Sequence, residues 1–226
     1  MDVVIVGGPH SGVGKTLAAE IALRALDGLG YGAIKLTVAD GERDPEHDHG
    51  SSALSVAHAA GICGRGASCG VCETVSTQLP SRLITNDGAI RKTGTDTWRL
   101  SEAGAVAVAW IISLREAAPA AIESAMSYLQ SKGARGVVIE GTTALDWMTP
   151  RASVMVATDP GRMWKDVALR QIRRCDIVLL NAVPMPSGDI PAPAALTAAG
   201  PLRCDLGSGK DEGAQRYRAR LLELCA

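Results

Sequence analysis

The chain has 226 residues and a formal net charge of −1, with 46% hydrophobic and 21% charged residues. This length and composition provide ample apolar material for one α/β domain over residues 1–226. The balanced charge argues against nucleic acid as a partner. The longest apolar stretch, residues 103–114, is too short to span a membrane.

Short apolar runs alternate along the chain with segments of helical periodicity. The runs predicted as strands are Val3–Val6, Ala33–Val38, Val106–Ser113, Gly136–Glu140, Ser153–Thr158, Asp176–Asn181 and the weaker Leu202–Leu206. The predicted helices are Lys15–Leu29, Pro119–Lys132, Arg162–Arg174 and Glu212–Leu224. Continuous apolar runs are typical of strands buried on both faces of a parallel sheet. The alternation predicts a doubly wound, mostly parallel α/β sheet of about seven strands, with helices on both faces and ligands at the carboxyl ends of the strands.

Residues 40–95 interrupt this alternation. They are polar and glycine-rich, and they hold three of the four histidines and three of the six cysteines. Within them, residues 74–86 can form one or two short edge strands, because Pro80 argues against a central strand. A structureless stretch of this length is unusual inside a compact domain. We therefore interpret residues 40–95 as an insertion with a role of its own, and residues 184–201 as a surface connection with a short helix.

The first predicted strand leads directly into a glycine-rich segment that precedes a helix. Backbone N–H groups of such a turn and of the helix start can surround a polyphosphate. We therefore predict a phosphate-binding loop. Its residues are Gly8, Ser11, Gly12, Val13, Gly14, Lys15 and Thr16. In this loop Lys15 reaches the β- and γ-phosphates, and the hydroxyl of Thr16 binds Mg²⁺.

Polar residues at other predicted strands are further candidates. Glu140 ends a buried strand where a Walker-B-type acid lies, and Asp40 follows the second strand, so both can hold Mg²⁺ or orient a water. The alternatives are a turn-capping carboxylate and a solvated loop acid. Lys35 is costly to bury unpaired and can meet a phosphate or an acidic substrate, or it can reach solvent at the sheet edge. Asn181 can read a nucleotide base or cap its strand, and without a full Asn-Lys-x-Asp motif the base stays open between GTP and ATP.

Three cysteines, Cys63, Cys69 and Cys72, lie close together among glycines in the insertion. Cys-x2-Cys is a common half-site for Zn²⁺ or an iron–sulfur cluster. A fourth ligand could come from a histidine of the insertion or from a partner chain, and the alternative is a loop with free thiols. Asp2 leads straight into a strand, which does not resemble a signal peptide. We therefore expect a cytoplasmic protein with reduced thiols.

Two families share features with this chain. The loop places its first glycine one residue further from the lysine than the common pattern does, and in this it resembles dethiobiotin synthetase. Four segments in order resemble the MobB-type GTP-binding proteins of molybdopterin guanine dinucleotide biosynthesis. These segments are Lys15–Thr16, Ile34–Thr37, Gly94–Ala105 and Glu140–Gly141. Leu36 and Val38 depart from the histidines that this family tends to have, and Thr95 replaces its lysine.

The MobB-type resemblance implies Mg²⁺-dependent binding and hydrolysis of GTP by an accessory protein for molybdenum-cofactor biosynthesis or insertion. It also implies a homodimer and a metalloenzyme maturation protein as partner. Hydrolysis would then switch residues 40–95. For Arg99 the resemblance implies a position facing the substrate or the γ-phosphate. The residues alone suggest a local ion pair with Asp96 at a helix start.

Two alternatives stay open. The first is an ATP-dependent small-molecule ligase of the dethiobiotin-synthetase type, with Lys15 and Lys35 near its substrate. The second is a metal- or redox-sensing nucleotide-binding module, in which the cysteine cluster receives the signal.

Overall fold

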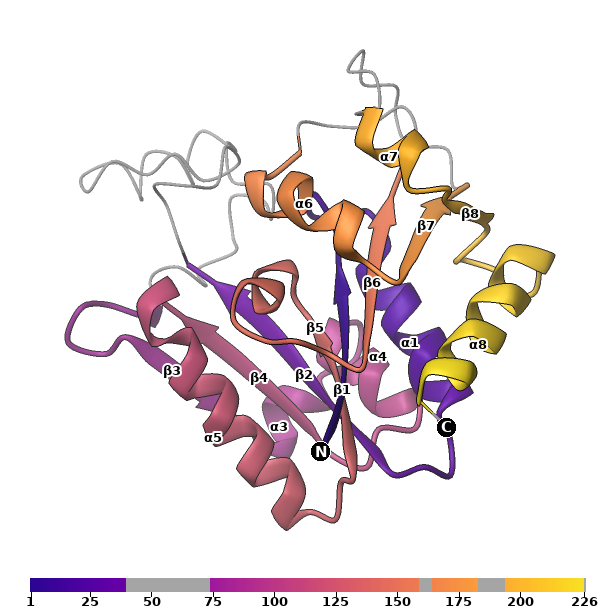
Figure 1. Ribbon diagram of the computed structural model, residues 1–226. Coiled ribbons are helices and arrows are strands. Elements are labelled where there is room, and N and C mark those ends of the chain that lie inside the picture. Colours follow the sequence, from indigo (N-terminus) through magenta and orange to yellow (C-terminus); the bar gives the residue numbers. More distant parts are fainter. Residues whose placement is uncertain (40–73, 159–163, 183–193, 226) are drawn as a thin grey trace.

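The computed structural model describes residues 1–39, 74–158, 164–182 and 194–225. In these residues the chain forms one eight-stranded sheet with the order β3-β4-β2-β5-β1-β6-β7-β8 (Figure 1). The strands are β1 (Asp2–Gly7), β2 (Tyr31–Val38), β3 (Ser81–Ile84), β4 (Val108–Ser113), β5 (Gly136–Glu140), β6 (Ala152–Ala157), β7 (Ile177–Asn181) and β8 (Leu202–Cys204). All neighbouring pairs in this sheet are parallel except β3 and β4. The predicted α/β class with a mostly parallel sheet is confirmed.

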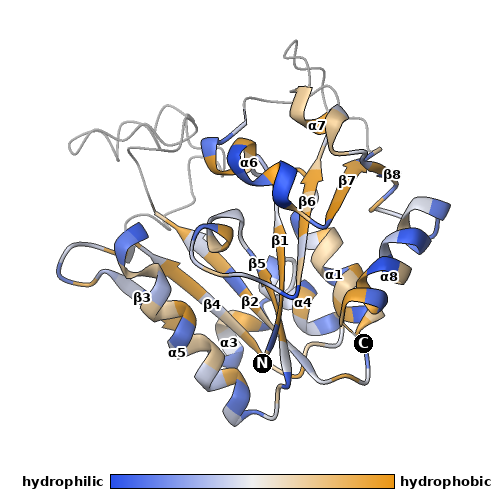
Figure 2. Cartoon of the chain, viewed as in Figure 1, coloured by the Kyte–Doolittle hydropathy of each residue, from blue (hydrophilic) through white to orange (hydrophobic). Residues whose placement is uncertain are grey.

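Helices cover both faces of the sheet (Figures 1 and 2). The α-helices of the described residues are α1 (Lys15–Ala25), α3 (Asp87–Ile90), α4 (Asp96–Glu102), α5 (Ala118–Ser131), α6 (Asp166–Gln171), α7 (Ala194–Ala198) and α8 (Glu212–Cys225). The short 3-10 helices are η2 (Arg115–Ala117), η3 (Thr142–Asp146) and η4 (Ile172–Arg174). None of the helices in the described part of the chain has the length and apolar character needed to cross a membrane.

The two faces follow from the alternation of side chains along each strand. In β1, Val4 and Val6 pack in a core with residues of α1, α4 and α8, whereas Val3 and Ile5 pack with α5. A third cluster packs β6 and β7 against α6 and α7. Figure 2 shows the result: the strands are mainly hydrophobic, and the hydrophilic residues of α5 and α8 lie away from the sheet.

The element bounds agree with the predicted ones most closely where the chain changes character abruptly. The run Gly136–Glu140 is β5 without change. Helix α1 ends at Ala25 instead of Leu29, and Gly28 and Gly30 beyond it have positive φ values of 80° and 76° that end a helix. The predicted edge strand exists as β3, which begins directly after Pro80 and pairs antiparallel with β4 at the sheet edge.

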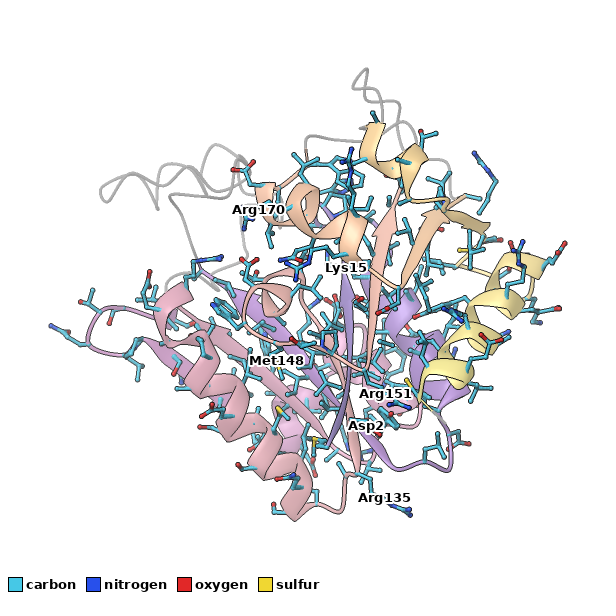
Figure 3. The ribbon with its side chains drawn as sticks, in the orientation of Figure 1. Asp2, Lys15, Arg135, Met148, Arg151 and Arg170 are labelled. Carbon is cyan, nitrogen blue, oxygen red and sulfur yellow. The ribbon has the colours of Figure 1, made fainter. Side chains whose placement is uncertain are left out.

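The strand order places the carboxyl ends of β1, β5 and β2 side by side. Glu140 at the end of β5 is in register with Val6 of β1 on one side and with Lys35 of β2 on the other. Two charged residues that are far apart in the sequence therefore lie next to each other, at the end of the sheet where β1 continues into the glycine-rich loop. In Figure 3, Lys15 lies toward this end, and Asp2 and Arg135 lie toward the opposite end.

Candidate functional site

The loop from Gly8 to Gly14 connects β1 to α1, and its backbone geometry requires glycine at three positions. A Cβ on Gly8 would lie 2.6 Å from Cγ1 of Val13, so a side chain there would force the loop apart. Gly12 and Gly14 have φ values of 78° and 107°, in the region that favours glycine. Val13 between them is fully buried and anchors the loop in the core. The spacing of glycines in the sequence therefore reflects a compact, tightly folded turn.

Two side chains from other strand ends hold this loop. The hydroxyl of Thr142 accepts a hydrogen bond from the Gly8 amide at 2.8 Å and donates one to the Gly8 carbonyl at 2.7 Å. Asn181 at the end of β7 donates from Nδ2 to the Val13 carbonyl at 3.1 Å, and its Oδ1 accepts from the Leu206 amide at 3.4 Å. Asn181 thus contacts the loop that was predicted to bind phosphate. Its role in reading a base stays a prediction.

Lys15 begins α1 and bends back over the loop. Its Nζ donates to the carbonyl of His10 at 2.5 Å, and Nδ1 of the buried His10 lies 2.9 Å from the carbonyl of Ser11. The ammonium of Lys15 therefore lies over the backbone that would surround a phosphate group. Ser11 lies in the turn beside Gly12, as the sequence predicts.

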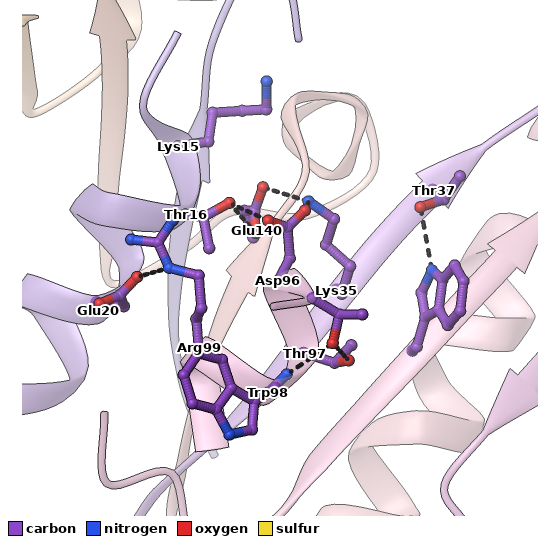
Figure 4. Close-up of polar contacts among 12 residues, drawn as sticks. Lys15, Thr16, Glu20, Lys35, Thr37, Asp96, Thr97, Trp98, Arg99 and Glu140 are labelled. Carbon is purple, nitrogen blue, oxygen red and sulfur yellow. Dashed lines mark hydrogen bonds and ion pairs between the residues drawn. The ribbon is translucent and has the colours of Figure 1, made fainter. Parts of the chain in front are cut away.

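Four side chains from four different elements meet beside this loop (Figure 4). They are Thr16 of α1, Lys35 of β2, Asp96 of α4 and Glu140 of β5, and we call them the charged ring. Nζ of Lys35 lies 2.6 Å from Oδ2 of Asp96 and 2.5 Å from Oε1 of Glu140. The hydroxyl of Thr16 lies 3.1 Å from the other oxygen of each carboxylate, Oδ1 of Asp96 and Oε2 of Glu140. The contacts close into a ring in which every carboxylate oxygen has a neighbour.

The ring is shielded from solvent on one side and its charges depend on one another. The Asp96 side chain, which is 45% exposed, lies on the open side. The Glu140 side chain is 2% exposed and that of Lys35 is 18% exposed. Burial alone would lower the pKa of Lys35, but the charges of Glu140 and Asp96 outweigh it and raise that pKa above its usual value. Burial alone would raise the pKa of Asp96, but the charge of Lys35 outweighs it and holds that pKa below its usual range. Lys35 is therefore an ammonium and Asp96 a carboxylate at neutral pH.

The position of the Thr16 hydroxyl fits a divalent cation. A hydroxyl carries one proton and can donate it to only one acceptor at a time. Two carboxylate oxygens lie 3.1 Å from this one hydroxyl, so one of the two contacts always brings lone pairs together. Hydroxyl and carboxylate oxygens are ligands that Mg²⁺ prefers. Thr16, Asp96 and Glu140 would be the residues that hold it, although no group of three His, Cys, Asp or Glu residues suited to a metal ion occurs in the described ranges.

Helices α1 and α4 are joined by the contact of Thr16 with Asp96 and by a second contact, an ion pair of Glu20 with Arg99. Nε of Arg99 lies 2.6 Å from Oε1 of Glu20, and the Glu20 side chain is 10% exposed. Thr16 and Glu20 lie four residues apart on α1, and Asp96 and Arg99 three apart on α4, so each pair shares one helix face. Arg99 thus connects α4 to α1 through Glu20, and toward Asp96 its charge only helps to lower the pKa of that carboxyl. Its orientation toward a γ-phosphate stays a prediction.

Several predicted site residues lie outside the described residues. These are Asp40, Cys63, Cys69 and Cys72, together with the histidines of the insertion. The described cysteines, Cys175, Cys204 and Cys225, are free thiols, and burial raises the pKa of Cys175 and of Cys204 to about 12. These two thiols are therefore protonated at neutral pH, which suits core residues and does not suit reactive groups.

The sequence reasoning missed two residues of this site. The sequence predicts Asp96 only as a helix-start residue, whereas the structure brings its carboxylate to Thr16 and Lys35. A threonine before an aspartate is typical of a helix start, and in the structure the Thr95 hydroxyl accepts from the Trp98 amide as the N-cap of α4. The sequence analysis does not predict Thr142, and the only sequence signal for it is its place two residues after Glu140.

Comparison of the chain with protein-family models, with curated proteins and with solved structures finds no match. The assignment of function therefore depends on the geometry of the loop and of the charged ring.

Proposed function

We propose that this chain binds a nucleoside triphosphate with Mg²⁺ and hydrolyses it, with the fold of a P-loop NTPase. The observation that carries this proposal is the meeting of Thr16 with Asp96 and Glu140 directly beside the glycine-rich loop. A loop with this steric pattern, a lysine over it and two carboxylates next to the helix-start threonine form the set that phosphoryl transfer requires. The order of strand, loop and helix supports the same proposal.

The residues divide the work by position. Backbone amides of the loop and the ammonium of Lys15 would surround the phosphate groups. Asp96 and Glu140 would hold the cation with Thr16, and Glu140, which is nearly fully buried, would also orient the attacking water. Mg²⁺ supplies neutralisation of charge on the phosphate oxygens. Asn181, next to the loop, would contact the base or hold the loop that carries it.

The biological setting comes from the resemblance to MobB-type proteins and is part of the proposal. In it the chain is a slow GTPase, a homodimer that assists molybdenum-cofactor biosynthesis or insertion. The order of the four motif segments supports it. The presence of Lys35 in the charged ring instead favours a second candidate, an ATP-dependent ligase of the dethiobiotin-synthetase type, because this lysine lies where it can contact an acidic substrate next to the phosphates.

The first test is thermal unfolding of anaerobically purified protein with Mg²⁺ and either GTP or ATP. A ligand that binds the native state raises the unfolding midpoint, and ligand at about 100 times its Kd adds about 2.7 kcal/mol of stability. A selective shift with GTP supports the accessory protein, and a selective shift with ATP supports the ligase. Absence of a shift with both nucleotides would contradict nucleotide binding.

The variant Lys15→Ala connects this shift to the loop. We expect it to lose hydrolysis by about 100-fold or more, with an unchanged circular dichroism spectrum, because it removes the positive charge closest to the phosphates. Lys132→Ala, an exposed lysine at the end of α5, is the matched control and keeps full turnover. Unchanged turnover in Lys15→Ala would remove the assignment of the phosphate loop.

A further inference from the structure

In the charged ring, each of the two carboxylates has one oxygen next to the Lys35 ammonium and the other next to the Thr16 hydroxyl. Asp96 uses Oδ2 for Lys35 and Oδ1 for Thr16, and Glu140 uses Oε1 for Lys35 and Oε2 for Thr16. The ammonium of Lys35 thus pairs with the same two carboxylates that the proposed function assigns to the metal. A divalent cation that bound both carboxylates and the hydroxyl would lie next to this ammonium.

An ammonium and a divalent cation cannot both lie there at low cost. Two positive charges a few ångströms apart repel each other strongly where solvent screening is weak, and the part of the ring formed by Lys35 and Glu140 is shielded from solvent. If Lys35 instead moved away without a new partner, its ammonium would lose both carboxylates in a strand whose other residues are mostly buried. A nucleoside triphosphate removes both difficulties, because its phosphate oxygens offer the displaced ammonium a new anionic partner.

We infer that Lys35 is the internal cation of this site, and that it makes uptake of the divalent cation conditional on the nucleotide. The inference rests on the proposed function for the identity of the nucleotide, but it concerns the carboxylate pair and Lys35 alone. Lys35 is thus a specificity-determining residue: the protein rejects the free cation and accepts the cation in complex with the triphosphate.

The test measures binding of Mn²⁺ alone, followed by the loss of the electron paramagnetic resonance signal of the free ion. Wild-type protein without nucleotide should bind Mn²⁺ weakly. The variant Lys35→Met keeps most of the side-chain length and removes the charge, so it should bind Mn²⁺ at least about tenfold more tightly without nucleotide. Lys132→Met is the matched control and should behave as wild type.

The double variant Lys35→Met/Glu140→Gln tests whether the Mn²⁺ binds at the carboxylate pair of the charged ring. It should lose the gain in Mn²⁺ affinity, because one of the two carboxylates is gone. If Lys35→Met does not fold, as judged by circular dichroism, Lys35→Gln takes its place, since its amide can still donate to a carboxylate. Tight binding of Mn²⁺ by nucleotide-free wild type, or absence of a gain in a folded Lys35 variant, would overturn the inference.

A separate measurement distinguishes this inference from the proposed function. Titration of wild-type protein with Mn²⁺ in complex with GTP or ATP tests the proposed function directly. If the complex does not bind but Lys35→Met still gains affinity for Mn²⁺, the proposed function fails and the role of Lys35 as the internal cation stands. If the complex binds and the Lys35 variants gain nothing, the inference fails alone.

Discussion

Two clusters of charged side chains follow strand ends of this sheet, and their compositions are opposite. In the charged ring, two carboxylates share the single ammonium of Lys35. In the second cluster, which we call the arginine cluster, Arg115 of η2 and Arg170 of α6 share the single carboxylate of Asp146 in η3. Helix η3 joins the two, because it begins two residues after Glu140 and ends at Asp146.

The difference in composition separates a candidate site from a structural contact. The arginine cluster is satisfied within the protein: Asp146 also accepts from Gln171 at 3.1 Å, and Arg115 lies 5.3 Å from the centre of the Trp147 ring. It fastens η2, η3 and α6 to one another on one face of the sheet. The charged ring has two carboxylates for one ammonium and one hydroxyl proton for two acceptors, so its contacts are not all satisfied within the ring. Ion pairs alone do not indicate function, and it is the position of the charged ring beside the glycine-rich loop that makes it the candidate site.

Among variants of the two clusters and of η3, we expect the largest effect when a carboxylate of the charged ring is removed, and we expect that effect on the rate of turnover. We expect Glu140→Gln to lower nucleotide hydrolysis by about 100-fold, equivalent to about 2.7 kcal/mol of transition-state stabilisation. The variant should keep its stability, because one carboxylate then remains for one ammonium. Steady-state hydrolysis and thermal unfolding measure the two effects, and Glu102→Gln on the exposed end of α4 is the control. Turnover within about twofold of wild type would exclude Glu140 from the reaction.

Removing the carboxylate of the arginine cluster should have the opposite result. We expect Asp146→Asn to lower the free energy of unfolding by about 2 kcal/mol, because two guanidinium groups lose their charged partner. Hydrolysis per folded molecule should not change, since Asp146 does not contact the charged ring. Urea unfolding measures the loss, with the exposed Glu123→Gln on α5 as the control. A variant that is stable but inactive would assign the arginine cluster to the site.

The pH dependence of this loss has a definite sign. Burial alone would raise the pKa of Asp146, but hydrogen bonds from Arg115 and Gln171 and the charges of Arg115 and Arg170 hold it below its usual range. A carboxylate with a lowered pKa stabilises the fold above its unfolded pKa of about 3.9, and this contribution is lost as the pH falls through the folded value. The stability difference between wild type and Asp146→Asn should therefore shrink below about pH 4. A difference that stays constant into strong acid would contradict this origin.

The sequence was sufficient for most elements because local signals define them. A continuous apolar run bounded by Gly136 and Glu140 leaves one choice for β5, and Pro80 restricts β3 to an edge. Helix α1 was predicted too long, because apolar periodicity continues to Leu29 although the helix has ended at Ala25. Periodicity describes which side chains can face the core, and it does not register where the backbone turns.

The candidate site was predictable only as far as its residues are close in sequence or belong to a known motif. Lys15 and Thr16 follow from the loop, and Glu140 from the end of its strand. Asp96 does not, because its role depends on how α4 packs against α1 and its contact with Thr16 spans 80 residues. The same holds for Thr142, whose contact with Gly8 spans 134 residues. Residue types and spacing do not predict such long-range contacts, because these contacts arise only when separate elements pack together.

The smallest expected effect lies in η3, between the two clusters. Thr142→Val keeps the shape of the side chain but removes the hydroxyl that both donates to and accepts from Gly8. The buried amide and carbonyl of Gly8 then lose their partner, and the start of the phosphate loop is less firmly held. We expect nucleotide affinity to fall about fivefold, or about 1 kcal/mol, in a titration with Mg²⁺ and nucleotide.

Two neighbours make this last variant informative. Thr142→Ser keeps the hydroxyl and should retain wild-type affinity, because its oxygen can make the same two hydrogen bonds. A merely steric role of the threonine methyl would instead weaken the serine variant and leave the valine variant, which keeps that methyl, at wild-type affinity. Thr143→Val, one residue further along η3, is the control for changes in the helix itself. If Thr142→Val lowers stability without lowering nucleotide affinity, then the whole of η3 has a structural role, as the arginine cluster at its end does. If Thr142→Val lowers nucleotide affinity and Thr142→Ser does not, then the start of η3 at Thr142 belongs to the candidate site and its end at Asp146 has a structural role.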